Sequence, residues 1–148
     1  MSLRGAQRLF LIIAILAGLG IAVSSVSLQH HYAKSKTSYC DFGESFSCDL
    51  VNRSQYSSIA GIPVALIGIA GYLALMALST LYREKAETPG MLVLASAGGL
   101  AFALYLTYVE GFILQAWCIL CLTSLTTIFL ITILSIVLLT QTMRRPAQ

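Results

Sequence analysis

Four cysteines are the residues of this chain whose spacing suggests chemistry. Cys118 and Cys121 lie three positions apart in the chain. Residues three apart share one face of a helix, so a disulfide between these two can form and open with little rearrangement in a first turn. At a helix start, the unpaired backbone N–H groups favour a thiolate and lower the pKa of a cysteine. The spacing therefore predicts a redox-active pair.

The other two cysteines, Cys40 and Cys48, enclose seven residues of a polar segment. A disulfide here either staples the loop or exchanges electrons with the first pair and with a soluble thiol protein. Buried structural thiols, and one zinc site built from all four thiolates, are the remaining interpretations. Only one pair has the spacing typical of zinc knuckles, and no polar metal-binding framework surrounds it, so we expect no bound metal.

The rest of the sequence predicts the elements that position these cysteines. The chain is 57% hydrophobic and 10% charged, whereas soluble domains carry about 25% charged residues. Uncharged runs long enough to cross a bilayer occur at about residues 9–28, 62–82, 91–109 and 118–140. We expect an all-α integral membrane protein, with residues 1–148 forming one four-helix bundle and residues 29–61 a long loop. Small residues in these runs should let helices approach closely; they are Gly18, Gly20, Gly68, Gly71, Gly98 and Gly99.

Basic residues near the span ends predict the orientation, because retained Lys and Arg favour the cytoplasmic side. The sequence favours an N-in, C-in topology with Arg4, Arg8, Arg83, Lys85, Arg144 and Arg145 inside. Both cysteine pairs then face the periplasm or cell exterior, where disulfides persist. A cleaved signal peptide is the alternative for the first span, but its long apolar run favours an anchor. The basic residues form no stripe, so we expect no nucleic-acid partner.

Three motifs resemble the vitamin K epoxide reductase family over about residues 8–142. They are Cys40-Asp41-Phe42-Gly43 through Ser47-Cys48, then Ser57-Ser58-Ile59-Ala60-Gly61-Ile62-Pro63, then Cys118-Ile119-Leu120-Cys121-Leu122-Thr123. The loop pair precedes the helix pair, which is the reverse of the order in DsbB, a protein that does similar work. The resemblance implies a four-helix bundle around a quinone pocket that the loop closes from outside.

The resemblance also implies a role for each cysteine by position. Cys121 faces the quinone, Cys118 exchanges with the loop, Cys48 is its loop partner, and Cys40 meets the soluble protein. Two pocket positions depart from the animal enzymes: Ser57 replaces an asparagine that hydrogen-bonds the quinone, and Leu125 replaces a tyrosine. These departures speak against epoxide reduction and anticoagulant binding. The Gly61-Ile62-Pro63 sequence at the start of the second span is similar to the bacterial branch of the family, whose members oxidise a thioredoxin-fold, DsbA-like partner.

The resemblance thus implies a thiol:quinone oxidoreductase of the inner membrane that uses ubiquinone or menaquinone and supports disulfide formation. Quinone or vitamin K epoxide reduction as the main output, and a non-catalytic scaffold stapled by disulfides, remain as alternatives.

Other polar residues carry weaker expectations. We expect solvated side chains for His30 and His31 rather than thiol activators. For Glu110 we expect an interface carboxylate rather than a proton carrier. Tyrosines in or near the spans can hydrogen-bond a quinone carbonyl, but we expect packing roles for them; they are Tyr72, Tyr105 and Tyr108.

Overall fold

The computed structural model describes residues 3–33, 43 and 45–144, so the role predicted for Cys40 lies outside the described residues. In this part of the chain the long elements are α1 (Leu3–Tyr32), α3 (Val64–Thr80), α4 (Thr88–Tyr108) and α5 (Ile119–Met143). The short ones are helix α2 (Cys48–Asn52), the 3-10 helix η1 (Gln55–Ser57), the π-helix η2 (Val109–Leu114), and strands β1 (Ser58–Ile59) and β2 (Ile62–Pro63), which pair antiparallel.

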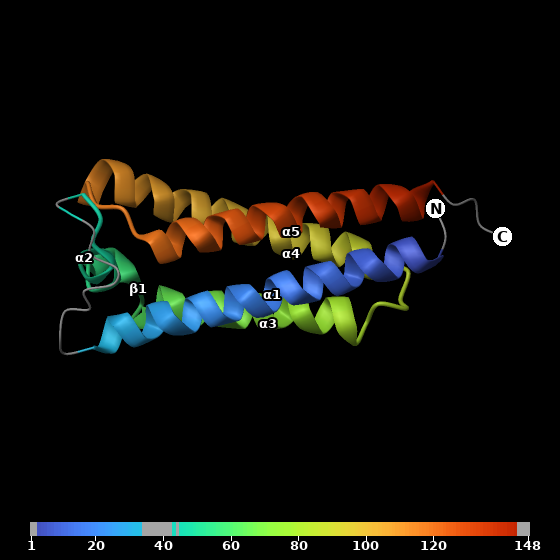
Figure 1. Ribbon diagram of the computed structural model, residues 1–148, viewed down its shortest axis with the longest axis horizontal. Helices are drawn as coiled ribbons and strands as arrows, with labels where there is room; N and C mark the ends of the chain where they lie inside the picture. Colours follow the sequence, from blue (N-terminus) through green and yellow to red (C-terminus); the bar gives the residue numbers. More distant parts are fainter. Residues whose placement is uncertain (1–2, 34–42, 44, 145–148) are drawn as a thin grey trace.

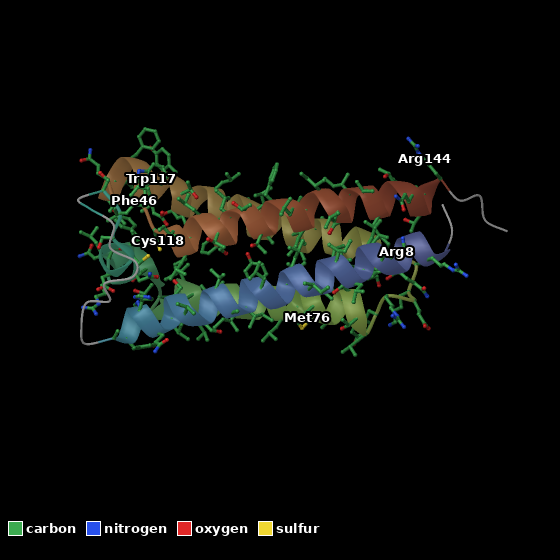
Figure 2. All side chains as sticks on the ribbon, viewed as in Figure 1. Arg8, Phe46, Met76, Trp117, Cys118 and Arg144 are labelled. Carbon is green, nitrogen blue, oxygen red and sulfur yellow. The ribbon has the colours of Figure 1, made fainter. Side chains whose placement is uncertain are left out.

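The long helices lie side by side along one axis, with α4 and α5 next to α1 and α3 (Figure 1). Helix α1 packs against α3 and α5, and α4 packs against α5 and α3. At one end lie α2 and β1, and at the other lie the start of α1, the end of α5 and the turn between α3 and α4. Cys118 therefore lies at the opposite end of the bundle from Arg8 and Arg144 (Figure 2).

Each uncharged run lies mostly within a helix, and the limits differ from the prediction by a few residues. Within the described residues, α1, α5 and the continuous α4–η2 segment are long and apolar enough to cross a membrane, whereas α3 is apolar but has 17 residues. The predicted second span begins at residue 62, yet Ile62 and Pro63 pair with β1 across a turn at Ala60 and Gly61, which both have positive φ. Helix α3 therefore starts only after the proline.

Large apolar side chains cover the outside of the bundle, among them Leu11, Ile15, Leu94 and Phe129. Water-exposed surfaces of soluble proteins rarely carry such extensive apolar area, so this exterior suits lipid. Inside, the buried face of α1 repeats every three or four residues through Phe10, Ile13 and Ala17, and packs against the other helices.

Close helix approach depends on some of the predicted glycines. A Cβ added at Gly20 would lie 2.4 Å from the Tyr72 ring, and one at Gly68 would lie 3.0 Å from the Ser24 hydroxyl. The α1–α3 contact therefore requires these small residues, as predicted. Gly71 and Gly98 differ, because nothing lies within 4 Å of a Cβ added at either.

Candidate functional site

The loop after α1 is fixed to the start of α5 by backbone hydrogen bonds. The Ser47 N–H donates to the Trp117 carbonyl at 3.2 Å, and the Trp117 N–H donates to the Ser45 carbonyl at 2.9 Å. Phe46 and Trp117 form a parallel bridge here, and both lie at the end of the bundle that holds Cys118 (Figure 2). Because the cysteines directly follow Ser47 and Trp117 in the chain, this pairing brings them together.

The two sulfur atoms are in contact. The Sγ atoms of Cys118 and Cys48 lie 3.4 Å apart, and both residues are 0% exposed. Cys48 is disulfide-bonded, whereas Cys118 and Cys121 are free thiols. Thiol–disulfide exchange begins with a thiolate next to a disulfide sulfur, which is the arrangement found here.

Cys118 directly precedes α5, which starts at Ile119, so Cys121 lies in the first turn. The pKa of the Cys118 thiol is lowered: the hydrogen bond with the Cys121 thiol lowers it most, and the backbone N–H groups of Cys121 and Leu120 lower it further. Burial and the Glu110 charge oppose this shift. The helix start therefore favours the Cys118 thiolate, as the sequence predicts, but the neighbouring thiol contributes more.

Asn52, at the end of α2, connects both cysteines to α1. Its side-chain amide donates to the Cys48 carbonyl at 2.9 Å and to Cys118 Sγ at 3.8 Å. Its Oδ1 accepts a hydrogen bond from the Ser27 hydroxyl at 2.6 Å. Sequence reasoning did not single out this residue, because an asparagine in a polar loop carries no pattern that distinguishes it.

The expectation of a solvated side chain is wrong for His30, and His31 is partly buried. His30 is 1% exposed, with Nδ1 lying 3.2 Å from Asp49 Oδ1. His31 Nδ1 donates to the Asn52 carbonyl and lies 3.3 Å from the Ser57 hydroxyl. Helix α2 packs against the end of α1 and covers His30, which a sequence pattern does not reveal.

The expectation of an interface carboxylate at Glu110 is also wrong. The side chain is 2% exposed, and Oε2 accepts a hydrogen bond from the Cys118 backbone N–H at 3.1 Å. The Cys121 thiol also interacts electrostatically with the carboxyl group. Glu110 lies in η2, a π-helix that ends where Gln115 adopts a positive φ of 51°. Such π-helical turns are frequent at functional sites.

A cavity of about 370 Å³ lies among the long helices and reaches α2 and η1. Cys121 and Ser57, both predicted to contact the quinone, line it. Leu125 is not among the lining residues; the preceding residue of α5, Ser124, lines the cavity instead, since adjacent positions of a helix face about 100° apart. The walls are mostly apolar and include Gly71 and Gly98.

Residues 11–136 of the 148-residue chain match the sequence profile of the vitamin K epoxide reductase family. This chain belongs to the vitamin K epoxide reductase family. The membership and the apolar helices make it a membrane oxidoreductase connected with quinone chemistry. Among the residues that the structure describes, no group of three or more His, Cys, Asp or Glu side chains is arranged to hold a metal ion.

The residues of this family member fit a quinone in the cavity. Its volume lies in the range of about 300–1,000 Å³ typical of ligand pockets, and its walls are apolar with few polar groups. The open space beside Gly71 and Gly98 suits a flat ring. The Tyr72 hydroxyl lies 2.9 Å from both the carbonyl and the hydroxyl of Ser124. Because a carbonyl only accepts, Tyr72 donates its one hydrogen to it, and the Ser124 hydroxyl therefore donates to the Tyr72 oxygen.

Three further hydroxyl groups that the sequence suggested offer the cavity no free donor. The Ser57 hydroxyl donates to the Ser54 carbonyl at 2.7 Å, so its hydrogen is used within the loop. Tyr105 and Tyr108 are 53% and 56% exposed and are not among the residues lining the cavity. Tyr72 and Ser124 are the hydroxyl pair in this part of the cavity wall, and their hydrogens bond within the pair and to the Ser124 carbonyl.

Proposed function

We propose that the chain is a thiol:quinone oxidoreductase that reoxidises a thioredoxin-fold, DsbA-like partner and passes the electrons to ubiquinone or menaquinone. One observation carries this proposal: Cys118 contacts the sulfur of disulfide-bonded Cys48, while Cys121, in the next turn, lines an apolar cavity. Electrons that enter at the loop then have a continuous path of sulfur atoms to the cavity.

In the proposed cycle a thiol of the reduced partner first attacks Cys40 and releases the Cys48 thiolate, and the partner's second thiol then frees Cys40 and leaves the partner as a disulfide. The Cys48 thiolate attacks Cys118 of the inner disulfide, and Cys121 leaves as a thiolate. Cys40 then attacks Cys48, which restores the loop disulfide and releases Cys118. The inner pair now holds two electrons as a dithiol. The observed state, with Cys48 in a disulfide and both inner cysteines as thiols, is consistent with this point of the cycle.

The chain's own residues prepare each exchange. Asn52 donates to Cys118 Sγ and favours its thiolate, and the backbone pairing at Trp117 keeps that sulfur beside Cys48. A bound quinone supplies a two-electron, two-proton acceptor. The mostly apolar wall that contains Tyr72, Ser124 and the glycines would hold it beside Cys121.

We further propose that α3 completes a four-span, N-in, C-in bundle with the cysteines on the periplasmic side of the inner membrane. Helix α3 has 17 residues, about 26 Å of helix, and Leu81 and Ile62 extend its apolar length toward the roughly 30 Å hydrocarbon core. Arg8 and Arg144 lie at the end opposite Cys118, which agrees with positive residues inside (Figure 2).

The test uses the full chain in lipid nanodiscs, reduced DsbA as donor and loss of quinone absorbance as readout. We expect the wild type to turn over. Cys121→Ala should abolish turnover and accumulate a disulfide between Cys48 and Cys118, which peptide mass spectrometry detects. Cys118→Ala should show neither turnover nor this disulfide. Thr126→Ala, an exposed change on the same helix, is the control. Normal turnover in Cys121→Ala would refute the mechanism.

The two alternatives give other results in the same assay. A reductase whose main output is reduced quinone or vitamin K would act on the epoxide with a dithiol donor. A disulfide-stapled scaffold would lose thermal stability when the cysteines are replaced and would show no turnover. Complementation of a strain that lacks its disulfide-forming quinone reductase would support thiol oxidation in the cell.

A further inference from the structure

The proposed function requires a route for protons as well as electrons. Oxidation of the inner pair breaks two S–H bonds, forms one S–S bond, and sends two electrons and two protons to the acceptor. Cys118 is fully buried, and Cys121 lies in the wall of an apolar cavity. A protein group that takes the proton from a thiol at this site therefore speeds the reaction, as general bases do.

Glu110 is placed for this task. Oε2 is fixed by the Cys118 backbone N–H, and the carboxyl group interacts electrostatically with the Cys121 thiol. The side chain is 2% exposed and lines the same cavity as Cys121. Oε1 is buried without a conventional N–H or O–H donor among the described residues. One oxygen thus orients the carboxyl group, and the other is available to take up a proton.

The other titratable groups that line the cavity are placed differently. His31 on α1 bonds to the Asn52 carbonyl, and Tyr72 on α3 bonds to Ser124. Tyr56 on η1 is 42% exposed. Of the titratable groups in this wall, Glu110 is the one in described contact with both inner cysteines.

Resting on the proposed function, we propose that Glu110 accepts the proton of the Cys121 thiol and delivers it to the acceptor in the cavity. The overall step converts two thiols and a quinone into one disulfide and a quinol. Glu110 carries one of the two protons and returns to its starting state. An ionised carboxylate buried without a cation is costly, which favours uptake of the thiol proton by Glu110; the reduced acceptor, which gains negative charge, then takes the proton from it.

Glu110→Gln separates proton transfer from positioning. The amide oxygen of glutamine still accepts the Cys118 N–H, but the side chain no longer accepts a proton. Glu110→Asp keeps the carboxyl group and shortens the side chain, and Glu110→Ala removes both functions. Glu87→Gln, an exposed change at the opposite end of the bundle, is the matched control.

We expect Glu110→Gln to slow quinone reduction about 100-fold, the lower end for loss of a general base, with little change in KM for the quinone. Glu110→Asp should retain more activity than Glu110→Gln, and Glu87→Gln should match the wild type. The rate of electron transfer from the partner to the inner pair, measured by thiol trapping in the absence of quinone, should be the same in Glu110→Gln as in the wild type.

A second readout needs no quinone. Infrared difference spectra between the reduced and oxidised inner pair should contain a carboxyl band that changes when the neighbouring Cys121 thiol becomes part of the disulfide. The band should be absent in Glu110→Gln and present in Glu87→Gln. This measurement also applies if Glu110→Gln folds poorly, because the wild-type and Glu110→Asp spectra alone then carry the test.

Several results would overturn the inference. The first is wild-type turnover in Glu110→Gln. If only Glu110→Ala is slow, the side chain acts by positioning Cys118 through Oε2 and not as a base. The third is a carboxyl band that does not change when the inner pair is oxidised. Failure of the proposed function looks different, because the wild type itself would then reduce no quinone.

Discussion

Replacing Asn52 with leucine tests whether the amide between the two sulfur-bearing segments sets the reactivity of Cys118. Leucine keeps the branched shape of the side chain and removes both amide donors, at 2.9 Å from the Cys48 carbonyl and 3.8 Å from Cys118 Sγ. It also removes the acceptor of the Ser27 hydroxyl.

The size of the effect follows from the lost bond to the thiolate. Hydrogen bonds to charged groups contribute about 1.5–3 kcal/mol, and the long distance of 3.8 Å favours the lower value. About 1.4 kcal/mol corresponds to a tenfold smaller thiolate fraction when the pH is below the pKa. A more basic thiolate is also more nucleophilic, which restores about threefold of this loss. We therefore expect exchange between Cys118 and Cys48 to slow about threefold near neutral pH.

The assay is the rate of Cys118 alkylation by iodoacetamide as a function of pH, in a Cys121→Ser background that keeps a hydroxyl donor beside Cys118. Because the pKa of Cys118 is lowered, its thiolate persists at pH values where an ordinary cysteine, with a pKa of about 8.5, is mostly protonated. The reactivity is lost as the pH falls through the pKa of the thiol. Asn52→Leu should move this loss to higher pH.

Gln55→Leu, which removes an exposed amide from the neighbouring η1, is the control and should leave the profile unchanged. Identical pH profiles for Asn52→Leu and its parent would refute the assignment of Asn52 as a thiolate donor. The midpoint of thermal unfolding should still fall in that case, because the buried Cys48 carbonyl loses its hydrogen-bond donor, at a cost of about 1–3 kcal/mol.

Two further substitutions test the cavity and the helix packing. Gly98→Leu would fill open space in the cavity wall. An overpacking cost of about 1–3 kcal/mol should lower kcat/KM for the quinone about 10- to 100-fold, while exchange between the cysteine pairs continues. Unchanged quinone kinetics would exclude the cavity as the binding site. Gly20→Ala places a Cβ 2.4 Å from the Tyr72 ring and should lower the midpoint of thermal unfolding, whereas Gly90→Ala, with nothing within 4 Å, should not; equal midpoints would contradict the close α1–α3 contact.

The sequence by itself determined the helices and the reactive helix start. Uncharged runs of about 20 residues form helices because backbone groups in lipid must satisfy their hydrogen bonds within the segment. The spacing of Cys118 and Cys121 placed a thiol pair at the beginning of α5, and the pKa of Cys118 is lowered there as expected. The order of the motifs also indicated the family, which the match over residues 11–136 confirms.

Local patterns also set helix limits, but less closely. The sequence placed the start of the second span at residue 62 because Ile62 and Pro63 continue an apolar run. In the fold these residues pair with β1 instead, since the positive φ at Ala60 and Gly61 turns the chain back on itself. Hydropathy does not register such a turn.

Only the tertiary structure decided which polar groups meet. Cys48 and Cys118 are 70 positions apart, and their contact depends on hydrogen bonds between the loop and Trp117. His30 and Glu110 are buried because α2 covers one helix end and η2 turns a carboxyl group inward. Each of these contacts joins segments distant in the chain, so neither composition nor periodicity specifies it; the folded loop does.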